Sequence, residues 1–323
     1  RLDQLAGYDE GDIGILPSAV EYEQVIDRNN SYTSKLYATS NTLTPSFTFR
    51  KTTSKGKWYC EFSMPIDLKH ERLDYRRGDI DTTLSRSSLL VGLYNTFMTW
   101  ESKVNRTQIG LWYTINSTTP DMQYMVNIHD DTDPLNIREG NAGLKNSYRH
   151  SWSFFYHKLK KVDHRIRGNI SFTHNAIAMG YNYDTSTGVR TYRAYNIDGN
   201  WNADVGYEMD YDIDKKKYVH LSSITRISHM QNVDLIGINS EGMRRSNVRT
   251  EGINETIKLN CRIGKQHIGA KFDGKWRYVH STRQDFNNMN IWDFNYGLTG
   301  NFSLLPKLQL STDITMYSRR GYS

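Results

Sequence analysis

The sequence has few cysteines and no long hydrophobic run, and each scarcity excludes a class of protein. Only Cys60 and Cys261 occur among 323 residues, which excludes a disulfide-stapled fold. Neither belongs to a C-x-x-C pair, so a cysteine zinc site is excluded as well. The longest apolar run is Leu89–Tyr94, whereas a membrane-spanning helix needs ~20 residues. Together with a mean hydropathy of −0.70, this excludes a helical membrane protein.

An excess of charge of one sign is also missing. Lys and Arg number 41 and Asp and Glu 35, which gives a net charge of only +6. The densest basic clusters, 158–161 and 215–217, each lie between two strand-like segments, where a solvated turn is the simplest interpretation. We therefore expect no nucleic-acid partner. Aromatic residues make up 12% of the chain, which argues against disorder.

Period-two alternation is the strongest pattern that is present. From Trp201 to Ile213 the odd positions are apolar or aromatic, whereas the even positions are Asn, Asp, Gly and Glu. Successive strand side chains point to opposite faces, so the segment predicts a β-strand with one apolar and one acidic face. The same alternation recurs at 58–68, 268–278, 292–304 and 308–316.

The length of segment 201–213 favours a membrane barrel. Its 13 residues span roughly 43 Å at ~3.3 Å per residue, and a tilt of about 45° gives a rise of about 30 Å, the thickness of a bilayer core. Strands of soluble sandwiches usually run about five or six residues, and a soluble β-sheet protein such as a propeller is the alternative. Tryptophans near the segment ends suit the aromatic girdles of such barrels: Trp100, Trp152, Trp201, Trp276 and Trp292.

The connections alternate between short and long polar links. Short links are expected at 53–56, 104–105, 160–164, 214–217, 264–265 and 305–307, and long ones at roughly 71–85, 118–146, 180–188, 231–249 and 284–289. The segments between them predict about twelve strands with antiparallel neighbours. The predicted fold is an all-β, antiparallel transmembrane β-barrel with long loops at one end and short turns at the other.

No linker divides the chain into two domains. Residues 1–43 are weakly patterned and rich in Asn, Asp and Gly, so we expect a loop-rich lead-in that belongs to the same barrel domain. Residues 44–323 are expected to form a partial outer-membrane β-barrel, the twelve strands being part of a larger barrel.

A recognisable motif lies in the long link before a strand-like segment at 148–156. Residues 133–145 read D-P-L-N-I-R-E-G-N-A-G-L-K. This resembles the N-P-L-x-I-x-x-G-N-P-x-L-K-P motif of TonB-dependent receptors and related outer-membrane β-barrel proteins, and the later stretch 188–207 is also similar to that family. Two residues depart from the motif, since Ala142 and Asn146 stand where the family commonly has Pro.

The residues of the motif also have a purely structural interpretation. Pro134 fixes φ, whereas Gly140, Asn141 and Gly143 tolerate positive φ, so the loop is suited to guide the chain into a strand. A ligand-binding role is the alternative.

The resemblance implies a location in the outer membrane and a function in nutrient binding or import at the cell surface. It also implies a plug domain and energy coupling through TonB, a protein of the inner membrane, although neither a plug nor a TonB-binding segment is visible in this sequence. Family barrels have more strands and finish on an aromatic residue, whereas this chain stops in the polar segment 319–323. We therefore expect an internal portion of a longer barrel domain, with outer-membrane lipid, TonB and an unknown nutrient ligand as its partners.

Two other functions stay open. One is a structural or secretion-linked outer-membrane barrel without transport, and the less favoured one is an outer-membrane hydrolase. The loop composition is mixed and selects no sugar, peptide or metal chelate as ligand.

Three clusters of ionisable residues could carry chemistry, but none closely matches a metal-binding or catalytic pattern. His70–Asp74 begins like H-E-x-x-H but ends in Asp and is expected in a loop, so zinc is not predicted. Asp210, Asp212 and Asp214 follow Glu208 at every second position, which indicates an acidic lumen face rather than a cation site. The acidic stretch 129–133 is interpreted as a solvated loop, with calcium the alternative.

No nucleophile or nucleotide-binding motif is found, so we predict that the protein is not an enzyme. We predict no catalytic, cofactor-binding or metal-binding residues, and the ligand-binding residues stay unassigned. Cys60 and Cys261 are expected to be free thiols on apolar strand faces.

Overall fold

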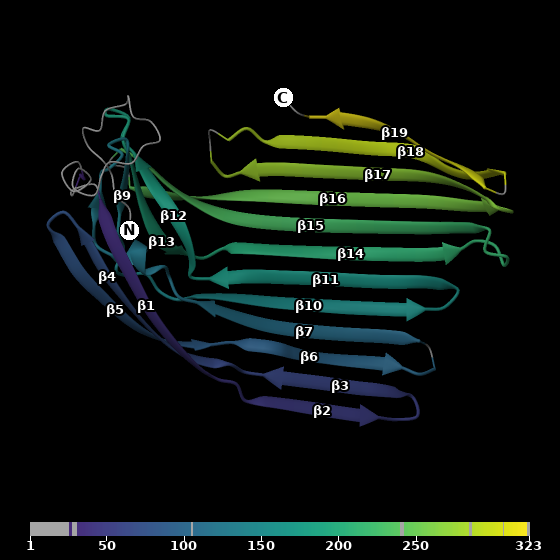
Figure 1. Cartoon of the computed structure of the whole chain (residues 1–323), viewed down its shortest axis with the longest axis horizontal. Helices are drawn as coiled ribbons and strands as arrows, with labels where there is room; N and C mark the ends of the chain where they lie inside the picture. Colours follow the sequence, from purple (N-terminus) through teal and green to yellow (C-terminus); the bar gives the residue numbers. More distant parts are fainter. Residues whose placement is uncertain are drawn as a thin grey trace.

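The computed structural model describes residues 26–27, 31–104, 106–239, 242–283, 286–305 and 307–321, and this part of the chain contains no α-helix. Twelve of its strands form one antiparallel path (Figure 1), which we call the wall. In spatial order the wall consists of β2 (Ser46–Thr52), β3 (Gly56–Ser63), β6 (Leu93–Ser102), β7 (Thr107–Thr118), β10 (Ser147–Leu159), β11 (Val162–His174), β14 (Asn200–Asp212), β15 (Val219–Ile238), β16 (Met243–Ile263), β17 (Gln266–Ser281), β18 (Met289–Leu305) and β19 (Leu308–Arg320).

The remaining elements gather at the end of the wall that carries the long links, and we call them the cap. They are β1 (Tyr32–Leu43), β4 (Ile66–Arg77), β5 (Ile80–Val91), the 3₁₀ turn η2 (Met122–Met125), β8 (His129–Asp130), β9 (Asn136–Glu139), β12 (Ala176–Tyr183) and β13 (Arg190–Ile197). Two short ladders there are parallel, β9 with β13 and β12 with β15, whereas every pairing along the wall is antiparallel. The predicted all-β, antiparallel fold is therefore confirmed, with parallel pairing confined to the cap.

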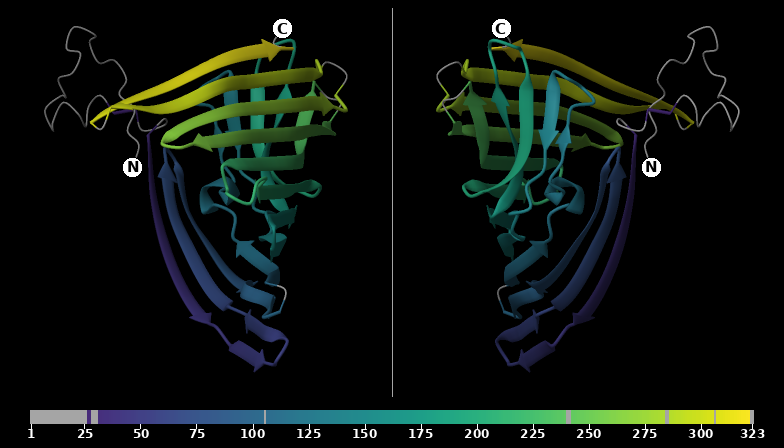
Figure 2. Two further views of the ribbon diagram at one scale, coloured as in Figure 1. Left: turned by 90° about the vertical axis from the view of Figure 1, so that its right-hand side faces the viewer. Right: turned by 90° about the vertical axis from the view of Figure 1, so that its left-hand side faces the viewer.

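The wall is a curved, open sheet in the described residues. β2 pairs only with β3 at one edge and β19 only with β18 at the other. Figure 2 shows the sheet curving from one edge to the other without meeting itself. None of the helices in the described part of the chain has the length and hydrophobicity to cross a bilayer.

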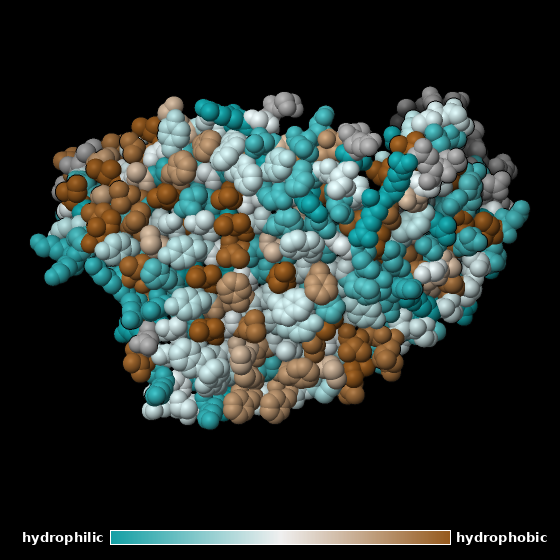
Figure 3. Space-filling model, turned by 180° about the vertical axis from the view of Figure 1, so that it is seen from behind, coloured by the Kyte–Doolittle hydropathy of each residue, from teal (hydrophilic) through white to brown (hydrophobic). Residues whose placement is uncertain are grey.

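The wall has one apolar and one polar face, and strand register makes each face continuous. Residues paired directly across neighbouring strands share a face, so one row can be followed through all twelve strands, and it is apolar except at Arg320 on the edge strand β19: Phe49, Cys60, Met98, Leu111, Phe154, Gly168, Val205, Ile227, Ile253, Trp276, Trp292 and Arg320. Hydrophobic side chains spread over the strands are visible in Figure 3. Both cysteines are free, as predicted, and Cys60 lies in this row.

The adjacent register row is mostly polar, and five of its six charged residues are basic. It runs through Arg50, Tyr59, Thr99, Gly110, Phe155, Arg167, Gly206, Arg226, Asn254, Lys275, Asp293 and Arg319. The alternation along single segments thus gives the whole wall two chemically different faces.

The apolar face is interrupted on β15 to β17, which the alternation does not predict. Glu255 accepts hydrogen bonds from the hydroxyls of Ser223, at 2.8 Å, and Thr225. Nearer the cap, Glu251 lies with one carboxylate oxygen 3.3 Å from His229 Nδ1 and the other 3.3 Å from His280 Nδ1. These groups share their face with Ile253 and Ile257 because they stand two residues from them on the same strand.

Strands β1, β4 and β5 correct two expectations about loops. Residues 32–43, expected in the lead-in, form β1, and the expected long link 71–85 is the β4–β5 hairpin. Residues 1–25 and 28–30 lie outside the described residues. β1, β4 and β5 continue β2, β3 and β6, respectively, beyond a break in the sheet at Pro45, Pro65 and Gly92. There the Met64 N–H donates to Pro45 O and the Gly92 N–H donates to Pro65 O.

Candidate functional site

The cap has its own hydrophobic core, which makes the long-loop end an ordered surface. Leu73 and Tyr75 of β4 pack with Met122, Met125 and Val126 of the segment between β7 and β8, and the core also includes Leu144 and Ala194. Leu73 and Met122 are each only 1% exposed. Fully burying such side chains contributes about 1.5–3 kcal/mol each. Three segments far apart in the sequence are therefore fixed against one another at one end of the wall.

Arg86 of β5 ties the motif loop to the cap. Its Nη1 donates to the carbonyl oxygen of Leu144 at 3.2 Å and contacts Met125 Sδ at 3.2 Å. Its Nη2 donates to Asn146 Oδ1. Asn146 is one of the two residues that depart from the resembled motif, and here its side chain accepts a charge-assisted hydrogen bond that proline could not accept.

Of the two motif glycines, only Gly140 is closely packed, and neither has positive φ. None of Gly140, Asn141 and Gly143 has positive φ, so that part of the interpretation is wrong. A Cβ on Gly140 would lie 1.6 Å from the carbonyl oxygen of Val126, whereas one on Gly143 would meet only the Asn141 side chain, at 3.2 Å. Asn141 joins the loop to β13 by donating from Nδ2 to the carbonyl oxygen of Ala194 at 2.8 Å.

The acidic stretch 129–133 is organised by a buried arginine. Arg77, whose side chain is 6% exposed, lies with Nη1 2.7 Å from Asp130 Oδ1, and its Nη2 donates to Thr132 Oγ1 at 2.9 Å. Burial raises the pKa of Asp130, but hydrogen bonds from Thr132 and the Arg77 guanidinium outweigh it, and the net pKa is lowered. Asp133 accepts instead from Asn136 Nδ2 and from Leu135 N–H, which lower its pKa. Among the described residues, no group of three or more His, Cys, Asp or Glu is arranged to hold a metal ion.

Acid should loosen the cap around Asp130. Because the folded pKa lies below the unfolded value of ~3.9, this carboxylate stabilises the cap above about pH 4, and the contribution is lost as the pH falls through the folded pKa. Hydrogen exchange of residues 119–146, corrected for intrinsic rates, should be unchanged between pH 7 and 5 and should rise towards pH 3. Asp130→Asn should show the faster exchange already at pH 7.

Asp184→Asn is the matched control for that measurement. Asp184 also has a lowered pKa, caused first by the hydrogen bond from Ser186, but its bonds stay within its own turn. The Asp184→Asn variant should leave hydrogen exchange in residues 119–146 unaltered. Loosening of the wild-type cap between pH 7 and 5 would contradict the assignment to a carboxylate.

The polar face carries the predicted acidic cluster near the short turns, but three of its four acids, Glu208, Asp210 and Asp212, contact a base. Arg165 lies 3.5 Å from Glu208 and 3.6 Å from Asp210, and His220 Nδ1 lies 2.9 Å from Asp212. The predicted acidic face is thus a charge-paired patch. Asp214, the third residue of the series, lies in the turn, where hydrogen bonding from Val219 N–H lowers its pKa.

His70–Asp74 lies in strand β4, not in the loop that was expected. The exposed His70 and Arg72 and the half-buried Asp74 share one side, and Arg72 Nε donates to Asp74 Oδ1 at 2.9 Å. On the other side, Glu71, Leu73 and Tyr75 are buried against the cap. The alternation over 71–77 was the signal for this strand, and it was missed because the segment is rich in charge.

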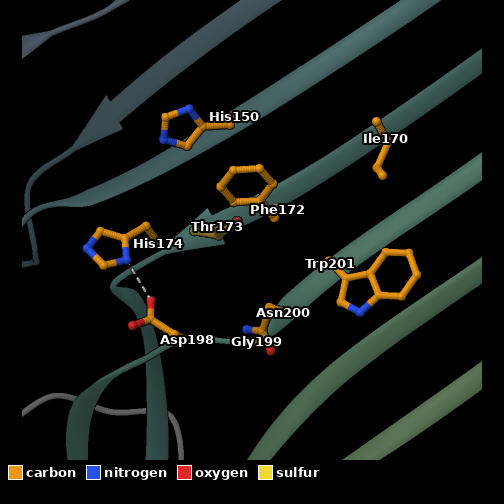
Figure 4. Close-up of a pocket in the computed structure, with 9 residues that line it drawn as sticks. All are labelled: His150, Ile170, Phe172, Thr173, His174, Asp198, Gly199, Asn200 and Trp201. Carbon is orange, nitrogen blue, oxygen red and sulfur yellow. Dashed lines mark ion pairs between the residues drawn. The ribbon is translucent and has the colours of Figure 1, made fainter.

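One surface hollow lies where β10, β11 and β14 reach the cap (Figure 4). It has a volume of about 590 Å³ and is rimmed by His150, Phe172 and Trp201. His174 Nδ1 and Asp198 Oδ1 form an ion pair of 3.0 Å at its edge. His150, Phe172 and Trp201 are register partners on the apolar face, so the hollow lies among aromatic side chains of that face next to the cap.

The second hollow lies inside the cap, and we call it the cap pocket. Its volume is about 340 Å³, and its lining is mostly polar: Glu139, Asn182, Thr191, Arg193, Tyr195, Gly242 and Met243. Glu139 lies in the motif at 133–145, and Thr191, Arg193 and Tyr195 lie in the similar stretch 188–207, but none was assigned to ligand binding, because the lining residues converge only through the β9–β13 and β12–β13 ladders.

Comparison with known proteins decides what kind of barrel wall this is. Residues 95–292 match the model of the outer membrane protein β-barrel family, which is more than half of the 323 residues. The chain belongs to this family. Its location is the outer membrane, as predicted, and its apolar face is the one that meets lipid. The match does not distinguish TonB-dependent receptors from other members.

Two further comparisons add little. No curated protein matches the chain. The solved structure of in-vitro folded OmpT, an outer membrane protein of Vibrio cholerae, covers 89% of this chain and 87% of its own with 8% identity and a TM-score of 0.28. A TM-score this low carries no argument.

Proposed function

We propose that the protein is a receptor-type outer-membrane barrel that captures a nutrient ligand at the cap, in the manner of TonB-dependent receptors. The cap carries this proposal, because ordered loops on a rigid β-scaffold are where binding sites are commonly built. Its core fixes β4, η2 and β13 relative to one another and leaves the polar cap pocket beside them. A barrel that only strengthens the membrane has no need for such a pocket.

The polar face of the wall supports passage of a hydrophilic ligand. Arg167, Arg226 and Lys275 lie in one register row across β11, β15 and β17, so the lumen is charged at this level. In the proposal, a plug domain and TonB drive release into the periplasm, and the protein catalyses no reaction. The motif at 133–145 is the link to receptors of that type.

Depletion of nutrients from a defined medium tests the function for a ligand of any identity. A strain that lacks the protein should fail to deplete at least one solute that the parent strain takes up, and a proton uncoupler should abolish the same uptake in the parent. A structural barrel would instead give general envelope leakiness, measured as detergent sensitivity, with no solute-specific loss. That outcome would contradict the proposed function.

A further inference from the structure

The cap pocket contains a carboxylate and a guanidinium on directly paired residues that form no ion pair with one another. Glu139 of β9 and Arg193 of β13 are direct register partners in the parallel β9–β13 ladder, and neighbouring strands are only ≈ 4.8 Å apart. Nonetheless, the only ion-pair contact of Glu139 among the described residues is with His129, at 3.9 Å. Arg193 lies over the ring of Tyr195, 5.9 Å from its centroid.

Two buried polar atoms in this pocket have no hydrogen-bond partner in the described part of the chain. They are Arg193 Nε, a donor, and Asn182 Oδ1, an acceptor. The amide nitrogen of Asn182 donates to the carbonyl oxygen of Asn239 at 3.0 Å, which fixes the side chain and leaves Oδ1 free to accept. A buried polar group without a partner costs about 1–3 kcal/mol, so a ligand that satisfied both atoms would bind favourably.

These groups converge because of strand register. Asn182 is the direct partner of Thr191 across β12 and β13, and Thr191, Arg193 and Tyr195 stand at every second position of β13, so all of them share one face of the small sheet. Glu139 joins the same face through its pairing with Arg193. Met243 at the start of β16 lies against this face, since a Cβ on Gly180 of β12 would come within 2.5 Å of Met243 Cε.

We infer that the cap pocket binds a small zwitterion of the amino-acid type. An ammonium group has three donors, and the pocket offers three acceptors for them: the Glu139 carboxylate, Asn182 Oδ1 and the Thr191 hydroxyl. The carboxylate of the ligand would accept from Arg193 Nε. Tyr195 and Met243 supply an apolar wall for a side chain.

A neutral sugar could bond to the same polar groups, but it would leave the paired opposite charges unused. The zwitterion is therefore the better match. This inference rests on the proposed function, of which it names the ligand class.

Calorimetry on the full-length protein in detergent tests the inference with leucine, N-acetylleucine, leucinamide and glucose as probes. Leucine should bind, each blocked derivative should bind at least tenfold more weakly, and glucose should not bind. Arg193→Gln should weaken leucine binding by about tenfold or more, as expected for one charge-assisted hydrogen bond, while the weaker binding of leucinamide stays unchanged. Glu139→Gln should act in the same way on leucine and spare N-acetylleucine.

Arg190→Gln is the matched control, because Arg190 is exposed on the same strand and contacts Tyr183 instead of the cap pocket. Equal binding of leucine and its blocked derivatives would overturn the inference, as would binding of glucose alone or of no probe. The series on the unmodified protein keeps the test decisive even if a variant misfolds. Loss of solute uptake with no leucine binding would reject the zwitterion and retain the transport function, whereas leucine binding without any uptake phenotype would do the reverse.

Discussion

Ile227→Arg is expected to destabilise the barrel by about 2–4 kcal/mol in lipid, the cost of an arginine on the lipid face near the bilayer midplane. Ile227 is 55% exposed on the apolar face. Its direct partners on the neighbouring strands are the apolar Val205 and Ile253. The nearest acids on this face, Glu251 and Glu255, stand two residues from Ile253 and already contact histidines and hydroxyls. Reversible unfolding in urea with lipid vesicles, followed by tryptophan fluorescence, measures the difference.

Ser228→Arg is the control for that experiment because it lies one residue further along the same strand. Ser228 is exposed on the polar face, with Asp204 as its partner on β14 and Gly252 as its partner on β16. Its replacement should cost less than about 1 kcal/mol, as for an ordinary exposed substitution. Equal costs for the two variants would mean that the two faces are not lipid and water.

Gly140→Val should disorder the cap and abolish ligand capture while leaving the wall intact. Its Cβ would collide with the Val126 carbonyl oxygen, which is backbone and is held next to the buried Met125. Overpacking against a fixed neighbour typically costs about 1–3 kcal/mol, and backbone contact puts this change at the upper end. We expect faster hydrogen exchange in 119–146 and loss of uptake, with normal assembly in the outer membrane.

Gly143→Ala tests whether the motif glycines are equivalent. Its φ is not positive and its Cβ would meet only the Asn141 side chain, at 3.2 Å, so uptake should be nearly unchanged. Similar damage from both variants would show that the motif depends on glycine flexibility rather than on the single close approach at Gly140.

The wall could be predicted from the sequence because the face on which a side chain lies depends only on its position in its own strand. Alternation such as that of 201–213 assigns each side chain to a face from its position in the strand alone, and the short turns at Lys160–Lys161 and Gly264–Lys265 separate the strands as expected. The alternation failed at Glu251 and Glu255, where the acids are matched by histidines and hydroxyls that come from other strands. A partner on another strand gives no signal in the sequence of a single segment.

The cap was not predictable in the same way, because its contacts join distant segments. Arg86 reaches Asn146, and Asn141 reaches Ala194, across 60 and 53 positions respectively. The segment 71–77 was expected in a loop because its charges mask the alternation of Leu73 and Tyr75. The cap pocket depends on the β9–β13 and β12–β13 ladders, which form only in the folded chain, and residues such as Arg193 have no local sequence signal.

The central claim is that one face of the wall meets lipid and the other meets water. Single cysteines with a fluorescent label at 205, 227 and 253, and separately at 226, 254 and 275, in a variant without Cys60 and Cys261, test it directly in membranes. We predict that lipid-confined quenchers reach the label at the first three positions only, whereas water-soluble quenchers reach it at the last three. Equal access at both sets, or lipid access at 226, 254 and 275, would contradict the account.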